Sequence, residues 1–335
     1  MKQDRISELA QNLNISKATV SKALRHCSGV ESGTRQNILD RAGERETPRD
    51  TAGCPIYAIL PDIPAGHWRE LRDGIFQCAH ETLYPINCNI YTRLHDDETV
   101  LAYLREARRL RPKALLVAIA FSDAIRKELA AWEPGCLILQ ISETHPLTNS
   151  FTVGADAYGD GAALGRRAAE YCAYDQFLYL ALGNSVTVSQ RLLGFFSTLD
   201  SLLPGAGSAA VPIAIEPQWL TKPKLFPAHL AAALAAAVNP FPPSRHLCLY
   251  APFGFHGLML AIDKAGIAGR VTLVGHDLLP ESAASCPAIV CRQDLRAQGR
   301  MAIRLAEEFI ATGGLYPPEK HILIPSAVVL PPEWA

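Results

Sequence analysis

The side chains best able to do chemistry in this sequence form no catalytic pattern. No set of Ser, Cys, His or carboxylate residues has the spacing of a nucleophile with its base. The run His95-Asp96-Asp97 could ligate a metal, but it stands in a polar stretch without further ligands, so a solvated loop is the favoured interpretation. The glycines from Gly159 to Gly165 do not have the spacing of a dinucleotide-binding loop. We therefore expect no enzyme activity, no cofactor and no metal.

Polar and aromatic residues instead follow apolar runs that read as strands. Asp277 comes shortly after the run at residues 271–275, and Arg191 opens the segment after another such run. Asp62 follows the first run, and His67, Trp68 and Arg69 come next. Because ligands of parallel sheets bind beyond the carboxyl ends of the strands, these residues are candidates for a binding site. A loop-capping Asp277 and a surface Arg191 are the competing interpretations.

The elements that would position these residues alternate between strands and helices. Expected strands cover residues 56–60, 86–91, 114–120, 136–141, 177–182, 211–215, 247–251 and 271–275. Expected helices cover residues 67–80, 98–110, 159–172, 188–203, 226–238 and 255–265, and a last helix at 294–311 precedes a strand at 322–329. Continuous apolar strands are covered on both faces, which predicts parallel, doubly wound sheets in two similar α/β lobes with ligand space between them.

The first 25 residues predict a different structure, two short helices joined by a turn. Apolar residues recur at helical spacing from Ile6 to Leu13, and the Ser16 hydroxyl can cap a second helix. Asn14 stands in the turn, where asparagine tolerates a left-handed backbone. This pattern is typical of a helix-turn-helix, whose second helix enters the major groove of DNA.

Charge and cysteine usage bound the partners and the compartment. The net charge is -1, and residues 1–50 carry nine basic against seven acidic side chains, so one copy should bind DNA modestly and a dimer is expected. The nine cysteines are scattered without zinc-finger spacing, as in a reduced protein. No signal sequence or membrane-length apolar run stands out, so we expect a cytoplasmic location and no membrane partner.

Residues 15–22 carry a specific resemblance. They read hydrophobic-Ser-x-x-Thr-Val-Ser-basic without a gap, after Ile6-Ser7-Glu8-Leu9-Ala10 and before Val30 and Thr34-Arg35. With this segment, the chain resembles the LacI/GalR (lactose repressor) family of bacterial transcriptional regulators over nearly its whole length. Weaker similarities are Asp156-x-x-Gly159, Ser189-Gln190-Arg191 with Gly194-Phe195, and Val274-Gly275-His276-Asp277.

The resemblance implies a small all-α helix-turn-helix domain followed by a two-lobed α/β domain like that of periplasmic binding proteins. We place the first at residues 1–46, a short linker at 47–55 and the bilobed domain at 56–335. Lobe 1 would hold about residues 56–155 and 290–318, and lobe 2 about 156–289 and 319–335.

The resemblance also implies a repressor of a carbohydrate or related operon that binds a palindromic operator as a homodimer or a tetramer. Lys17, Ala18 and Lys22 would read bases, since lysine donates to guanine and an alanine methyl contacts thymine. Phosphates would be held by Ser16, Thr19, Ser21, Arg25 and Thr34. Solvated helix charges remain the alternative for the two lysines.

For the small-molecule effector, the resemblance implies that Arg191 donates to hydroxyls or acidic groups and that Asp277 accepts from sugar hydroxyls. Trp219 would stack on a sugar ring, or pack in the core or on the surface. The remaining expected effector contacts are Asp62, His67, Trp68, Arg69, Phe253 and Asp156.

Two departures from the family pattern qualify this picture. Residues 45–55 contain no leucine, so the usual hinge helix that wedges into the minor groove is missing and the operator should bend little. Ala251-Pro252-Phe253 replaces a polar pair of sugar-binding relatives, which favours a modified, acidic or less polar effector over a simple hexose. The expected effector classes are sugars, sugar acids and sugar phosphates. Two alternatives are disfavoured. A bilobed solute-binding protein would need an export signal and no helix-turn-helix, and an enzyme on an α/β scaffold would need a catalytic set.

Overall fold

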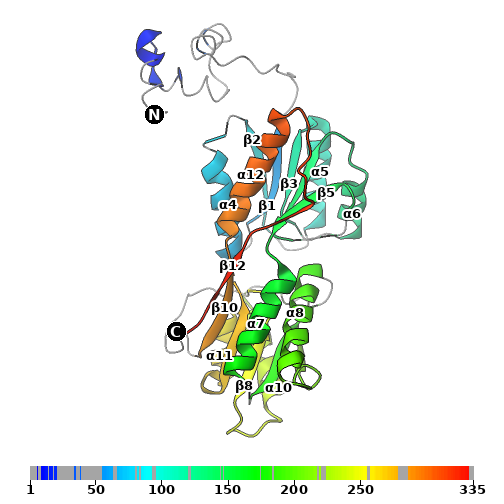
Figure 1. Ribbon diagram of the computed structural model, residues 1–335, viewed down its shortest axis with the longest axis vertical. Coiled ribbons are helices and arrows are strands. Elements are labelled where there is room, and N and C mark those ends of the chain that lie inside the picture. The colour runs from blue at the N-terminus through cyan, green and yellow to red at the C-terminus, as the bar shows by residue number, and fades with distance from the viewer. Residues whose placement is uncertain are drawn as a thin grey trace.

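The computed structural model shows a bilobed α/β body (Figure 1). It describes residues 6, 9–13, 15–17, 19–20, 34, 38, 55–62, 66–79, 81–82, 84–92, 96–119, 122–143, 145, 147–173, 175–182, 185–216, 219, 224–254, 257–277 and 286–331. The predicted base or phosphate contacts Ala18, Ser21, Lys22 and Arg25 lie outside these residues, as does the linker up to residue 54. No helix among the described residues is long and apolar enough to cross a membrane.

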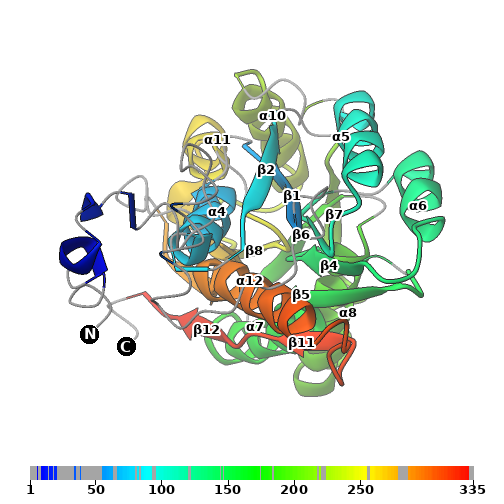
Figure 2. The same ribbon diagram turned by 90° about the horizontal axis from the view of Figure 1, so that it is seen from above.

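Lobe 1 is built on a fully parallel sheet with strand order β11-β5-β4-β3-β1-β2. Its strands are β1 (Ile56–Pro61), β2 (Ile86–Tyr91), β3 (Ala114–Val117), β4 (Leu137–Ile141), β5 (Ser150–Gly154) and β11 (His321–Leu323). One face packs on α4 (Gly66–Ala79) and α12 (Leu295–Ala311), and the other on α5 (Asp97–Leu110) and α6 (Asp123–Ala130). Figure 2 shows the two helix pairs on opposite sides of this sheet. Because helices cover both faces of this sheet, its strands can be apolar along their whole length.

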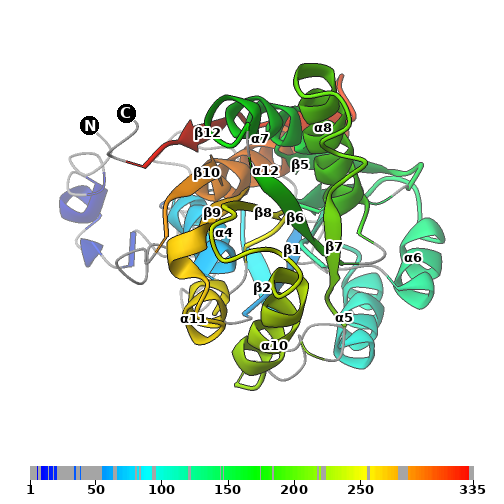
Figure 3. The ribbon, with the colours of Figure 1, turned by 90° about the horizontal axis from the view of Figure 1, so that it is seen from below.

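Lobe 2 repeats the plan with strand order β12-β10-β9-β8-β6-β7. Its strands are β6 (Gln176–Ala181), β7 (Val211–Ala214), β8 (Leu247–Ala251), β9 (Val271–His276), β10 (Ala288–Gln293) and the antiparallel β12 (Ser326–Val329). Helices α7 (Ala157–Tyr171) and α8 (Val186–Leu202) cover one face; α10 (Phe226–Val238) and α11 (Leu258–Lys264) cover the other (Figure 3). A 3-10 turn at Ala268–Arg270 precedes β9.

The chain passes between the lobes three times within the described residues, before α7, at Asp294 and between β11 and β12. The predicted lobe boundaries at 290 and 318–319 are wrong, because the chain changes lobe a few residues later in both places. β10 still pairs with β9 in lobe 2, and the chain leaves only at Asp294, whose carboxylate caps α12 through the Ala297 amide at 2.7 Å. The single strand expected at 322–329 is two strands, because β11 pairs with β5 before β12 returns to β10.

Helices α7 and α8 approach each other closely because glycines meet at their contact. A Cβ at Gly161 would lie 2.9 Å from the carbonyl carbon of Arg191, and one at Gly165 would lie 2.5 Å from the Phe195 oxygen. On α8, Gly194 in turn faces the Tyr158 carbonyl. The glycine-rich segment of the sequence is thus an ordinary helix, as expected, and its glycines set the depth at which Arg191 sits.

The described N-terminal residues include helical positions on both sides of a turn. Residues 9–12 and 19–20 are helical, and the Thr19 amide donates to the Ser16 hydroxyl at 3.0 Å, which is the predicted cap. The Ile15 amide donates to the Ala10 carbonyl at 3.0 Å and closes the end of the first helical segment. Leu9 and Ala10 of the first segment form a small buried apolar cluster with Val20 and Ile38.

Candidate functional site

Arg191 and Asp277 come together at the carboxyl ends of lobe 2 strands. Arg191 lies in the second turn of α8, which begins after the cap made by Ser185 to the Val188 amide at 3.2 Å. Its guanidinium donates to the Pro252 carbonyl just after β8 at 2.9 Å and approaches an Asp277 oxygen at 3.9 Å. The two side chains are only 7% and 10% exposed, so the pair is largely removed from water. The structure thus brings these two predicted effector contacts to one place.

The backbone conformation of Asp277 and a chain of hydrogen bonds hold its carboxylate in place. It adopts φ 49°, a left-handed conformation that aspartate tolerates better than most residues. Both carboxylate oxygens accept from Gln293, one from its backbone amide at 3.0 Å and one from its side chain. The Gln293 side chain in turn accepts from Gln298 at 3.1 Å. This chain of hydrogen bonds fixes an acceptor beside the Arg191 guanidinium.

Glu143 adds a second carboxylate from the opposite lobe. It follows β4, and its Oε2 accepts from the Thr187 hydroxyl on α8 at 3.2 Å. Burial raises the pKa of the Glu143 carboxyl, although Arg191 and the Thr187 hydrogen bond lower it. The side chains of Glu143 and Arg191 therefore face a shared polar region between the lobes, where the hydrogen bond joins lobe 1 to lobe 2.

Tyr250 packs beside Arg191 and contacts its backbone. Its ring stacks on Phe195 with centroids 3.8 Å apart, and its hydroxyl donates to the Arg191 carbonyl at 3.2 Å. The same hydroxyl lies 3.1 Å from Nε2 of His276. Tyr250 is fully buried, and its hydroxyl connects the backbone of α8 at Arg191 to His276 of strand β9.

Chemically, this arrangement can bind a polar molecule. Nε of Arg191 is buried without a partner within the described structure, so one donor of the guanidinium remains to be satisfied. Donors and acceptors lie side by side in a low-dielectric setting, which suits hydroxyl or carboxyl groups of a ligand. A buried donor left unpaired costs about 1–3 kcal/mol, so ligand contact there would be favourable.

Among the other predicted contacts in lobe 1, the three whose side chains the structure describes do not join this group. The side chain of Trp68 is 9% exposed and packs in the core beneath α4 and α12, not at a rim. Asp62 pairs with Arg72 of α4, and Arg69 is exposed. His67 lies in the first turn of α4, and its side chain is outside the described part. The sequence could not predict which of these residues is buried and which is exposed, because a helix points successive side chains to different sides.

In lobe 2, three predicted contacts have structural partners of their own. Asp156 caps α7 by accepting from the Gly159 amide at 2.9 Å. Trp219 stacks on His229 with centroids 5.5 Å apart and packs against the core under α10, which agrees with its core-packing alternative. Phe253 is partly buried against the same core.

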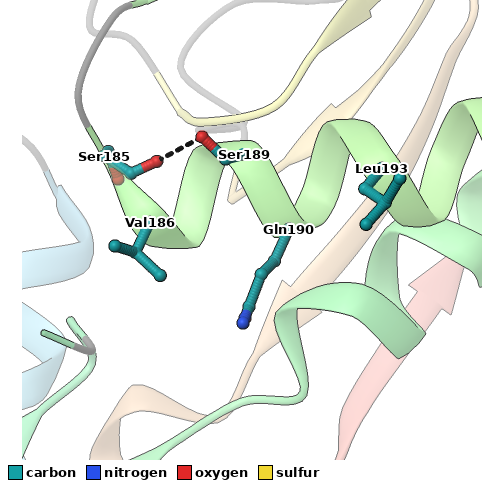
Figure 4. Close-up of a pocket in the computed structure, with 5 residues that line it drawn as sticks. All are labelled: Ser185, Val186, Ser189, Gln190 and Leu193. Carbon is teal, nitrogen blue, oxygen red and sulfur yellow. Dashed lines mark hydrogen bonds between the residues drawn. The ribbon is translucent and has the colours of Figure 1, made fainter. Parts of the chain in front are cut away.

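A shallow pocket of about 320 Å³ lies along α8 (Figure 4). Its lining residues recur at helical spacing on one face of the helix and are Ser185, Val186, Ser189, Gln190 and Leu193. Arg191 and Thr187 point from other positions of the same helix into the protein, where both are buried. The pocket is therefore separate from the Arg191–Asp277 site.

Sequence reasoning missed Glu143, Thr187 and Gln293. Glu143 comes two residues after a predicted buried strand, so the rule that used Asp277 could have found it as well. Gln293 ends β10, a strand that was not predicted, and only its pairing with β9 brings it to Asp277.

The fold agrees with known bilobed binding proteins. No family model matches the sequence, and no curated relative matches it. A glucose-galactose binding protein from Geobacillus stearothermophilus is 15% identical with a TM-score of 0.64, and the match covers 82% of this chain and 97% of that one. A carbohydrate transporter solute-binding protein from Agrobacterium radiobacter in complex with D-arabinose is 15% identical with a TM-score of 0.68, covering 84% and 95%.

A putative LacI transcriptional regulator from Bacteroides fragilis is also similar. It is 13% identical with a TM-score of 0.63, and the match covers 82% of this chain and 96% of that one. At these identities, the likeness shows the two-lobed α/β fold with parallel sheets and leaves the function to the residues themselves.

Proposed function

We propose that this protein is a ligand-responsive, DNA-binding transcriptional regulator, most simply a repressor that acts as a homodimer on a palindromic operator. On this proposal it works in the cytoplasm, catalyses no reaction, and binds a small polar effector of the sugar, sugar-acid or sugar-phosphate class between its lobes. The DNA-binding part belongs to the first 46 residues and the effector site to Arg191, Asp277 and Glu143.

The observation that carries the proposal is the N-terminal pattern. The Ser16 hydroxyl caps a helical segment through the Thr19 amide at 3.0 Å, one turn after residues 9–12. Lys17 and Ser16 are exposed beside this cap, where a recognition helix would present them to bases and phosphates. The apolar cluster of Leu9, Val20 and Ile38 supports a compact unit of a few helices. Thr34, a proposed phosphate contact, is partly buried.

The effector part rests on the buried polar group between the lobes. Arg191 has an unpaired buried Nε, Asp277 is a fixed acceptor, and Glu143 comes from the other lobe. Structurally similar proteins bind D-arabinose and D-allose, which supports a polyhydroxylated ligand of similar size. Ligand contact to both lobes would change their relative placement and so the spacing of two DNA-binding units. A ligand can do this only through its differential affinity for the two states.

The DNA-binding proposal is tested with the full chain on DNA fragments from upstream of its own gene. Lys22→Ala should abolish specific footprinting, because it would remove a base contact and a positive charge. Lys127→Ala, an exposed lysine on α6, is the matched control and should leave the footprint unchanged. A footprint that survives Lys22→Ala unaltered would remove the assignment of the recognition helix.

A solute-binding protein is the second candidate, because most of the similar solved structures are transporter components. The two candidates differ in one property that selection from random DNA can measure. A regulator enriches one palindromic sequence at physiological salt, whereas a solute-binding protein enriches none and still binds its sugar.

A further inference from the structure

Three potential metal ligands from distant parts of the chain meet in the interior of lobe 2. They are Asp160 on α7, His276 at the end of β9 and Cys291 on β10. One ligand atom from each lies within 4.8 Å of the other two, and the three residues are 8%, 0% and 1% exposed. None of the predicted effector contacts belongs to this group.

Hydrogen bonding fixes which nitrogen of His276 is available. The Tyr250 hydroxyl has one hydrogen and donates it to the Arg191 carbonyl at 3.2 Å. Its contact with His276 at 3.1 Å therefore requires Nε2–H of the imidazole to donate to the hydroxyl oxygen. In the neutral ring this leaves the lone pair on Nδ1, which is buried without any partner in the described structure. Burial and the nearby Arg191 lower the pKa of His276, which favours that neutral ring.

The other two ligands are an oriented carboxyl group and a reduced thiol. Ser326 donates to Oδ2 of Asp160 at 2.8 Å and so orients the carboxylate, as outer hydrogen bonds commonly do for metal ligands. Cys291 is a free thiol, and burial raises its pKa to about 12, so it carries a proton that a metal would displace. A metal ion would supply the partner that Nδ1 lacks.

Charge and distance both suit a divalent ion. Asp160, Asp277 and Glu143 place three carboxyl groups around one guanidinium, that of Arg191. Burial raises the pKa of Asp160 and of Glu143 because their negative charge is poorly compensated there, so added positive charge is favoured. With Zn–N and Zn–O bonds of about 2.0–2.2 Å and Zn–S of about 2.3 Å, tetrahedral ligand atoms lie about 3.3–3.6 Å apart. Ligand atoms within 4.8 Å reach this geometry by shifts of about 1 Å.

We propose that Asp160, His276 Nδ1 and Cys291 form a binding site for a divalent transition metal, with Zn²⁺ as the ion that one carboxylate, one imidazole and one thiolate suit best. The thiol proton leaves to solvent as the Cys291–metal bond forms, and the fourth position remains for water. This inference departs from the sequence expectation of no metal, and it does not depend on the proposed DNA binding.

The site is tested on the full chain, refolded with Zn²⁺ or with Co²⁺ because the ligands are buried. We expect one Zn²⁺ per chain, a higher melting temperature with Zn²⁺, and thiolate-to-cobalt charge-transfer absorption with Co²⁺. Cys291→Ser should abolish that absorption, whereas Cys248→Ser, a buried cysteine of the same core, should keep it. Tyr250→Phe should weaken Zn²⁺ binding about 10- to 100-fold, since Tyr250 orients the His276 ring.

Measurements on the unaltered chain keep the test valid even if a buried variant fails to fold. A wild-type chain that takes up no Zn²⁺ and shows no thiolate band with Co²⁺ overturns the proposal. Zn²⁺ uptake that persists in folded Cys291→Ser and His276→Phe variants also overturns it, because the ion would then sit elsewhere.

Discussion

The closest helix contact in lobe 2 gives the sharpest test of how the site is positioned. Gly161 on α7 faces the backbone of Arg191, and a Cβ there would lie 2.9 Å from the Arg191 carbonyl carbon. Ordinary contacts of this kind begin at 3.4 Å, so Gly161→Ala must move the two helices apart by at least 0.5 Å. If the guanidinium moved with its backbone, its 2.9 Å hydrogen bond to Pro252 would pass the usual upper limit of about 3.2 Å.

The energetic effect follows from two opposing terms. Overpacking a close contact costs about 1–3 kcal/mol, whereas replacing glycine by alanine inside a helix returns about 0.5–1 kcal/mol. The atoms that the new Cβ would meet belong to the Arg191 backbone, so the overpacking cost lies in the upper part of its range. We therefore expect Gly161→Ala to lower the free energy of unfolding by about 1–2 kcal/mol. For a lobe of this size, that corresponds to a fall in Tm of about 2–8 °C.

Calorimetry or circular dichroism during heating measures this change. Gly269→Ala is the matched control, because a Cβ at Gly269 meets nothing within 4 Å and its backbone is not left-handed. The control should be neutral or slightly stabilising. Equal Tm values for Gly161→Ala and the wild type would refute the close approach of α7 and α8 at Arg191.

Three further predictions concern the site and the operator. Alanine at Arg191 or at Asp277 should weaken effector binding about 10- to 100-fold by calorimetry, since a charged hydrogen bond contributes about 1.5–3 kcal/mol; unchanged affinity in both would place the effector elsewhere. Because burial raises the pKa of Glu143 above 4.5 in the folded state, the contribution of this group to stability is fully present below 4.5 and declines as the pH rises through the folded pKa. Glu143→Gln, whose amide oxygen can still accept from Thr187, should remove that decline from denaturation curves recorded against pH, and an unchanged curve would contradict the pKa assignment. The absence of leucine from residues 45–55 predicts little operator bending in circular-permutation gels, and a strong bend would show that another segment kinks the DNA.

Local pattern was enough to predict most elements of the two lobes. Runs such as Ala114–Val117 and Leu247–Ala251 are apolar throughout, and a strand is the element that can bury every residue between two helix layers. The Ser16 cap was likewise readable, because a hydroxyl and an amide three residues apart interact within one turn. The same local pattern predicted that Asp277 and Arg191 each come after the end of a buried strand.

Tertiary structure decided the properties that depend on which distant segments meet. The apolar run of β10 at residues 288–291 is short and does not indicate which sheet it joins, and only its pairing with β9 places it in lobe 2. β11 and β12 go to different sheets although two residues separate them. The partners Glu143 and Thr187 lie 44 positions apart, on different lobes. Sequence spacing carries no record of such contacts, because they form only when sheet order and helix packing bring the segments together.

The proposed metal ligands also meet only through tertiary packing. Asp160, His276 and Cys291 look unrelated along the chain, and the sequence by itself indicated scattered thiols and no metal ligand set. Only the adjacent positions of β9 and β10, with α7 packed over them, place the three side chains within reach of one another. The sequence determined which chemistry the side chains could offer, and the packing of lobe 2 determined which of them meet.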